Sequence, residues 1–193
     1  MRNRMILLKT VAALALAGMS LGACTTTTTA NKAPAADQRA DIVRGADTTL
    51  DRLYKEVKGS RELVAKSNGA LVFPNVVNAG LIVGGEYGKG VLITGGRPSG
   101  YYSMGSVSVG LQAGAQSKAI IILFMTRDAL EKFRASSGWT AGVDGTVAVL
   151  KVGANGEVDT TTATQPVEAM VLTNAGLMAG VSLEGTKISK LDL

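Results

Sequence analysis

The side chains that could do chemistry in this 193-residue chain are few, and histidine is absent. Its absence excludes His-ligated metal sites, Ser-His-Asp and Cys-His relays, and histidine pH switches. Ser103, Ser106 and Ser108 lack the Gly-x-Ser-x-Gly elbow, and a Ser-Lys pair would have only Lys118 as its candidate base. The acidic candidates, whose spacing does not indicate paired carboxylates, are Glu86, Asp144 and Glu168. The sequence therefore predicts a protein that is not an enzyme, with no metal site and no cofactor.

The glycine-rich stretch from Gly84 to Gly90 could in principle cradle a phosphate. A P-loop requires Ser or Thr after its Gly-Lys pair, and here Lys89 is followed by another glycine. A dinucleotide fingerprint must open a helix, whereas residues 91–93 (Val-Leu-Ile) are typical of a strand. We therefore interpret this stretch as a tight hairpin turn.

Cys24 is the only cysteine and follows a segment with the parts of a secretory signal in order. Three basic residues, Arg2, Arg4 and Lys9, lie near the start of the chain. An apolar run covers residues 11–16, and small residues follow it. That run is too short to span a bilayer comfortably. Residues 21–24 (Leu-Gly-Ala-Cys) resemble a bacterial lipobox, which implies cleavage before Cys24 and acylation of its sulfur and new amine. We expect residues 1–23 to be a lipoprotein signal peptide; the alternative is an ordinary signal peptide with an incidental cysteine.

Acylation at Cys24 would attach the protein durably, because each buried methylene contributes roughly 0.8 kcal/mol and the lipobox implies three chains. Position 25 is threonine and not aspartate, which by analogy with enteric sorting favours the outer membrane of a bacterial cell envelope, at its periplasmic face. Residues 24–37 are rich in threonine and alanine and predict a solvated tether. The folded domain is then expected to cover residues 38–193.

The net charge of +5 is mostly a property of the signal segment. Without its three cations, 17 basic residues face 15 acidic ones, which leaves +2. Aromatic residues make up only 4% of the chain, too few for a base-stacking platform. We expect no nucleic-acid partner.

Three helices are predicted from apolar periodicity and capping residues. Over residues 37–58, apolar side chains recur at three and four residues, which predicts an amphipathic helix capped near Asp37 and ended by Gly59-Ser60. Its polar face carries both signs of charge, so we interpret it as packed on a sheet and not as a membrane-surface helix. A short helix is expected over 61–66, closed by Asn68-Gly69, and another over 127–135, capped by Thr126.

Short Val-, Ile- and Leu-rich runs separated by glycines predict strands, with a turn at Pro74-Asn75 and a hairpin at Asn155-Gly156. The run over 119–125 is the most apolar and should be a central strand buried on both faces. The fold class is therefore α+β: a mainly antiparallel, glycine-rich sheet or partly closed barrel with an N-terminal amphipathic helix and a short helix near 127–135. The expected strands are 70–73, 76–83, 90–94, 101–111, 118–125, 146–152, 157–162, 167–174, 177–183 and 187–189.

Several sequence blocks follow one another along the chain. They run from Gly69 (GALVFPNVVNAGLIVGGEYGKGVLI) through Gly100–Ser103 (GYYS) and Ser108–Gln116 (SVGLQAGAQ), and two more are Leu123–Phe133 and Ala175–Ile188. In this order the blocks resemble the SYLF domain, a lipid-binding domain family, and the last two are similar to its C-terminal blocks. The resemblance covers about residues 40–191.

The resemblance implies a non-enzymatic domain that binds membrane phospholipid. Eukaryotic members of the family bind phosphoinositides with the help of an amphipathic N-terminal helix, some associate with actin, and bacterial members are typically secreted or lipoprotein forms. The alternative is a structural or protein-interaction envelope lipoprotein, such as a surface antigen, with an unknown protein partner. The basic residues that could meet a lipid head group are Arg39, Arg44, Arg52, Lys55 and Lys58.

Overall fold

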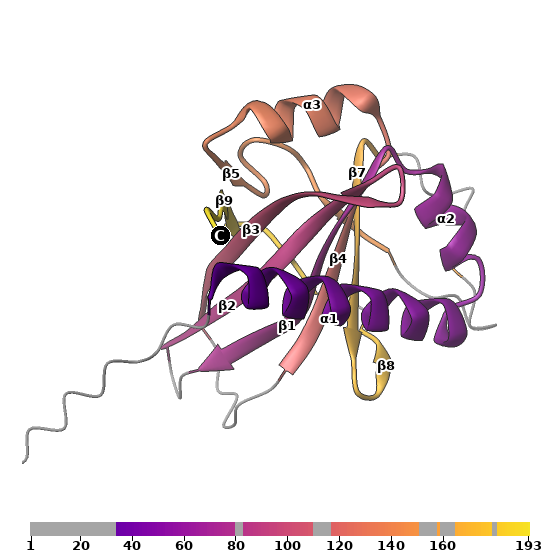
Figure 1. Ribbon diagram of the computed structural model, residues 1–193, viewed down its shortest axis with the longest axis horizontal. Helices are drawn as coiled ribbons and strands as arrows, with labels where there is room; N and C mark the ends of the chain where they lie inside the picture. Colours follow the sequence, from indigo (N-terminus) through magenta and orange to yellow (C-terminus); the bar gives the residue numbers. More distant parts are fainter. Residues whose placement is uncertain (1–33, 80–82, 110–116, 151–157, 159–164, 179–180) are drawn as a thin grey trace, which may run out of the picture. The chain divides into compact units, whose positions relative to one another are not determined.

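The computed structural model describes residues 34–79, 83–109, 117–150, 158, 165–178 and 181–193, which belong to one compact unit, Ala33–Leu193 (Figure 1). Cys24, the predicted signal peptide and almost all of the predicted tether lie outside the described residues. The elements in chain order are α1 (Ala35–Glu56), α2 (Ser60–Lys66), β1 (Gly69–Ala79), β2 (Val83–Thr94), β3 (Arg97–Val109), β4 (Ser117–Phe124), α3 (Arg127–Ala135), β5 (Gly138–Thr140), β6 (Ala148–Val149), β7 (Val167–Thr173), β8 (Gly176–Leu177) and β9 (Lys187–Lys190).

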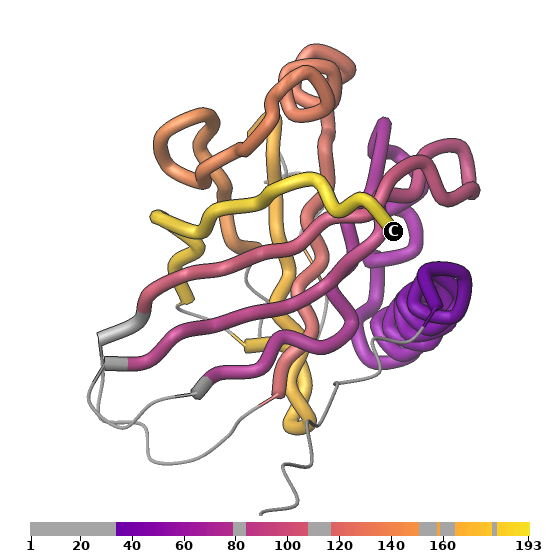
Figure 2. Tube along the Cα trace, turned by 60° about the vertical axis from the view of Figure 1, so that its left-hand side comes forward, coloured from indigo at the N-terminus to yellow at the C-terminus, as the bar shows by residue number. Residues whose placement is uncertain are grey.

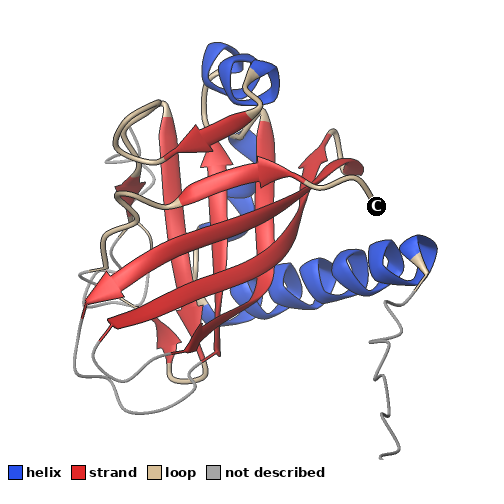
Figure 3. Ribbon diagram, turned by 90° about the vertical axis from the view of Figure 1, so that its left-hand side faces the viewer, coloured by secondary structure: helices blue, strands red, loops and turns tan. Residues whose placement is uncertain are grey.

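The strands form one strongly curled sheet in the order β5-β9-β3-β2-β1-β4-β7-β6, with β8 added to β7 (Figure 3). Neighbouring strands are antiparallel except β6 and β7, which are parallel. The predicted α+β class, the mainly antiparallel sheet and the partial closure are therefore confirmed.

Each face of the sheet carries its own apolar core. Along β4, Ile120 and Ile122 point to the core under α3, whereas Ile121 and Leu123 point to the core under α1 and α2. We refer to these as the α3 face and the α1 face. Figure 2 shows α1 lying on one side of the strands, with α3 at their upper end. Because β4 is buried on both faces, the predicted central strand is confirmed.

The long helix α1 packs on the sheet through one stripe, whose buried members are Ile42, Ala46, Thr49 and Leu53. It begins at Ala35 with Pro34 as its N-cap, so the predicted cap at Asp37 is wrong; Asp37 instead lies in the first turn, where a carboxylate suits the helix dipole. Among the described helices, no segment is long and apolar enough to cross a membrane.

The two shorter helices were predicted nearly in place. Gly59, with φ of 80°, precedes α2, and Ser67 ends it in an extended conformation. The predicted left-handed stop at Asn68-Gly69 is therefore wrong, because Gly69 already begins β1. At α3, Thr126 accepts a hydrogen bond from the Ala129 N–H, which confirms the predicted cap.

The glycine-rich stretch 84–90 is not a hairpin, because β2 runs straight through it. The turn between β2 and β3 lies at Gly95-Gly96, within the turn predicted over 95–100, and both residues have positive φ. At Gly90, an added Cβ would lie 2.5 Å from the Phe73 ring and from the Val72 carbonyl oxygen. Glycine is needed in this strand because the side chains of β1 lie directly over it.

Other strand predictions need smaller corrections. The two strands predicted over 70–83 are one strand, β1, whose register shifts between Val72 and Asn75; Pro74 marks this irregularity and not a turn. β5 was not predicted, and β6 and β8 are only two residues long, far shorter than the predicted strands 146–152 and 177–183. The predicted hairpin at Asn155-Gly156 lies outside the described residues.

Candidate functional site

Three residues considered for chemistry in the sequence meet on the α3 face of the sheet. Glu86 and Lys118 form an ion pair of 2.8 Å, with side chains only 12% and 16% exposed. Ser106 lies on the neighbouring strand and donates to the second oxygen of Glu86 at 3.4 Å, and Asn78 reaches the first at 3.5 Å. Lys118 is thus bound to the carboxylate and not to a serine. The cluster joins β1, β2, β3 and β4 and neutralises two buried charges.

The other acidic candidates do not join this cluster. Asp144 accepts a hydrogen bond from the Thr140 N–H at 2.6 Å and so holds the loop after β5. Glu168 is completely buried on β7, where the Gln165 N–H donates to one oxygen, and no described residue donates to the other. Burial raises the pKa of Glu168 above its usual range. No group of three or more potential metal ligands is found in the described ranges.

A cleft of about 590 Å³ separates α1 from the end of the sheet on the α1 face. We call it the arginine cleft, because Arg44 and Arg52 of α1 both line it. Its opposite wall comes from β1, β4, β7 and the turn after β7. The remaining lining residues are Asp41, Gly45, Thr48, Thr49, Pro74, Asn75, Ser117, Lys118, Ala119, Leu172 and Asn174.

The two arginines of this cleft are held differently. Arg44 is exposed and pairs with Asp41 one turn earlier. Arg52 is half-buried and donates from Nη2 to the Thr173 carbonyl at 3.3 Å, while its Nε lies 3.7 Å from Glu56. That Nε is buried and donates no hydrogen bond to any described residue. The cleft therefore offers guanidinium N–H groups beside amides and hydroxyls, the donor set that binds a phosphate or carboxylate.

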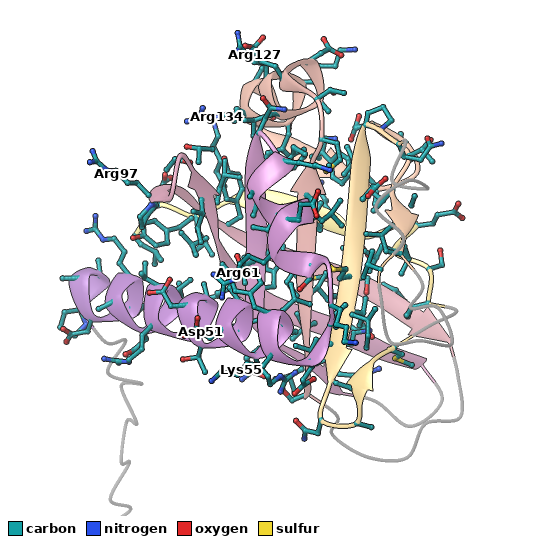
Figure 4. The ribbon with its side chains drawn as sticks, turned by 90° about the vertical axis from the view of Figure 1, so that its right-hand side faces the viewer. Asp51, Lys55, Arg61, Arg97, Arg127 and Arg134 are labelled. Atoms are coloured by element: carbon teal, nitrogen blue, oxygen red, sulfur yellow. The ribbon has the colours of Figure 1, made fainter. Side chains whose placement is uncertain are left out.

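The other basic residues proposed for head-group contact lie elsewhere. Arg39 is exposed near the start of α1 and lines a shallow hollow beside Tyr101. Lys55 is exposed on α1, and Figure 4 shows it on the helix together with Asp51. Lys58 is exposed between α1 and α2. Of the five, the structure brings Arg44 and Arg52 to one cleft.

A second cleft, of about 520 Å³, lies between α1, α2 and the β2–β3 turn. Half-buried apolar side chains line it, including Leu50, Tyr54 and Ile93. The Arg61 guanidinium lies 4.2 Å from the centre of the Tyr54 ring, and Figure 4 shows Arg61 between the two helices. Burial raises the pKa of Tyr54, and the nearby Arg61 charge partly opposes that rise.

The contact between Tyr54 and Arg61 was not predicted from the sequence, because Gly59 interrupts the helical periodicity between these two residues. The wall of the arginine cleft was not predicted either, since Asn75, Ser117 and Asn174 come from three separate strands or turns. The available signal was only the polar character of these residues at strand ends.

Comparison with known proteins gives a family for the C-terminal part of the domain. Residues 105–192, from within β3 to two residues beyond β9, match the family Ysc84, described as Las17-binding protein actin regulator. Among curated proteins, the SH3 domain-containing YSC84-like protein 1 of Xenopus laevis is 30% identical over 129 residues, which is 64% of this chain. The chain spans only 38% of that relative. These two matches support the resemblance to the SYLF-domain family that the sequence blocks indicate.

Proposed function

We propose that this protein is a membrane-anchored lipoprotein whose SYLF domain binds phospholipid head groups without catalysis. The observation that carries the proposal is the convergence of Arg44 and Arg52 in one cleft, opposite Asn75, Ser117 and Asn174. A phosphate can accept two parallel hydrogen bonds from one guanidinium, and this geometry makes arginine a specific binder of phosphate. Arg44 and Arg52 outnumber Asp41 among the charged side chains of the cleft, because Lys118 is paired with Glu86, so the remaining charge favours an anion.

The charge arrangement sets how a head group would bind. Asp41 competes with any phosphate for Arg44, because the two side chains are paired. Arg52 is fixed from behind by the Thr173 carbonyl, so its guanidinium is already oriented. Binding should therefore be modest in affinity and should weaken as salt screens the partly exposed charges.

The test of phospholipid binding uses residues 24–193 with Cys24→Ser, a substitution that removes the acylation site. This protein keeps the unit Ala33–Leu193 with both of its apolar cores. Phosphatidylglycerol vesicles should co-sediment with the protein, phosphatidylcholine vesicles should do so less, and 0.5 M salt should release it. The proposal is abandoned if neither vesicle binds and if mass spectrometry finds no lipid copurifying with the protein.

Attachment at Cys24, in the outer membrane of a bacterial envelope and facing the periplasm, is the second part of the proposal. It rests on the lipobox resemblance of residues 21–24. Intact-mass measurement on the membrane-extracted protein should give residues 24–193 plus three acyl chains, and Cys24→Ser should remove the added mass. A mature chain without acyl mass would contradict it.

The family's description names a protein partner, Las17, for its members. For this chain, binding of a protein partner is the competing function. It would be favoured if a crosslinking pulldown found one stoichiometric partner and the protein did not bind vesicles.

A further inference from the structure

An apolar patch lies exposed on the α1 face, toward the end of the sheet where β1 ends and β2 begins. It consists of Val77 on β1, Tyr87 on β2 and Val107 on β3, which are 41%, 54% and 79% exposed. Val77 and Tyr87 are direct cross-strand partners, and Val107 lies opposite Gly85, two residues from Tyr87. The three side chains are therefore neighbours on one face of adjacent strands.

The patch has open space above it because glycines separate its members. A Cβ added at Gly85 would have the Ser106 carbonyl oxygen as its nearest neighbour, at 3.8 Å. A Cβ added at Gly105 would likewise meet only the Glu86 carbonyl oxygen, at 3.8 Å. Among the residues that the structure describes, no side chain therefore packs over these two glycines, and the apolar side chains around them are exposed.

The polar surroundings of the patch match a membrane interface. Asn75, two residues before Val77 on the same strand, lines the arginine cleft, and so does Ser117, which pairs with Val77. On the other side, Lys89 lies two residues beyond Tyr87 on β2 and on the same face. An apolar centre containing tyrosine, flanked by cations, is the composition found where proteins enter the head-group layer.

The first turns of α1 lie close to this region. Lys89 donates a 2.9 Å hydrogen bond to Gln38 near the start of α1, so the helix begins close to the patch. Nine residues lie between Cys24 and Pro34, so ten Cα-to-Cα steps join them. They can span at most about 35 Å, because an extended chain advances about 3.5 Å per residue. An anchor at Cys24 would therefore hold the start of α1 within that distance of the bilayer.

We propose that the patch of Val77, Tyr87 and Val107 rests on the phospholipid bilayer and enters its interfacial layer, with the arginine cleft at the level of the head groups. This inference rests on the proposed phospholipid binding and adds the orientation of the domain on the membrane. The three apolar side chains would bury their surface in the bilayer. Arg44, Arg52 and Lys89 would attract the lipid phosphates electrostatically.

The test places a single environment-sensitive fluorophore on residues 24–193 with Cys24→Ser. One protein carries Val107→Cys and the matched control carries Val143→Cys, a valine that is 81% exposed in the loop after β5. On phosphatidylglycerol vesicles, the label at 107 should shift to shorter wavelength and be quenched by lipids with nitroxide on the acyl chain, whereas the label at 143 should do neither. In unlabelled protein, Val77→Ser with Val107→Ser should weaken vesicle partitioning by about tenfold.

Other outcomes have distinct meanings. Protein that co-sediments while the label at 107 behaves like the label at 143 overturns this orientation and leaves phospholipid binding standing. Protein that does not co-sediment overturns the orientation, and it overturns phospholipid binding as well if no lipid copurifies with it. A shift at 107 that appears without vesicles and rises with protein concentration, together with dimers in ultracentrifugation, would assign the patch to a second copy of the chain and overturn the proposal.

Discussion

The Lys89 ammonium on β2 donates a 2.9 Å hydrogen bond to the side-chain oxygen of Gln38, near the start of α1. This contact joins residues 51 positions apart and ties the first turns of α1 to β2.

Lys89→Met should remove this bond while the aliphatic part of the side chain stays. Because a single hydrogen bond of this kind contributes about 1 kcal/mol, amide exchange in residues 36–42 should increase about fivefold, with little change elsewhere. Hydrogen–deuterium exchange with mass spectrometry measures this. Arg97→Met, at an exposed residue of the β2–β3 hairpin, is the control and should change nothing in α1. Unchanged protection in Lys89→Met would show that α1 is fixed by its buried stripe alone.

Gly90→Ala should destabilise the domain by about 1–3 kcal/mol, because the new methyl group would overlap the Phe73 ring and the Val72 carbonyl. Gly105→Ala in the neighbouring strand meets nothing closer than 3.8 Å and should leave stability within about 0.5 kcal/mol of the wild type. Urea unfolding compares the two. Equal effects would mean that the close approach of β1 to β2 does not require glycine.

The Glu86–Lys118 pair should show strong coupling in a double-mutant cycle. Glu86→Gln or Lys118→Met alone leaves one charge partly buried without its partner and should cost about 1–3 kcal/mol. The double variant should cost less than the sum of the single ones, since it removes both charges. Additive losses in urea unfolding would show that the pair contributes no mutual stabilisation.

Glu168 should make stability depend on pH. Its pKa is raised in the folded state by burial, so the folded protein retains this proton more strongly than the unfolded chain. Stability should therefore fall as pH rises from the ordinary carboxyl range, about 4.5, toward the raised pKa. Glu168→Gln should be more stabilising, relative to the wild type, at pH 7 than at pH 4, whereas Glu131→Gln on the exposed side of α3 should show no such difference. Equal effects of Glu168→Gln at both pH values would contradict this sign.

Local patterns predicted much of the fold, and pairing between distant strands accounts for what they missed. The helices at 35–56 and 127–135 and the buried strand at 117–124 follow from periodicity and capping that each segment carries itself. The glycines of 84–90 were interpreted as a turn because the sequence does not reveal that Phe73 packs against Gly90 from the next strand.

The candidate site was predictable only in part for the same reason. Arg44 and Arg52 are two turns apart on one helix, so their joint position could be proposed from spacing. Asn75, Ser117 and Asn174 meet them only through the order β1-β4-β7 of the sheet. Val77, Tyr87 and Val107 become a patch only through strand register.

The most direct measurement of the central claim compares two pairs of arginines that carry the same charge. Arg44→Gln with Arg52→Gln changes the arginine cleft, and Arg127→Gln with Arg134→Gln changes exposed residues on α3, which Figure 4 shows away from α1. Thermal unfolding first confirms that both double variants fold. Co-sedimentation of residues 24–193 carrying Cys24→Ser with phosphatidylglycerol vesicles should weaken about tenfold or more for the cleft pair, because each basic residue near the surface contributes about 1 kcal/mol, and it should stay within about twofold for the α3 pair. Equal weakening by both pairs would show that only net charge matters and would contradict a head-group site in the arginine cleft.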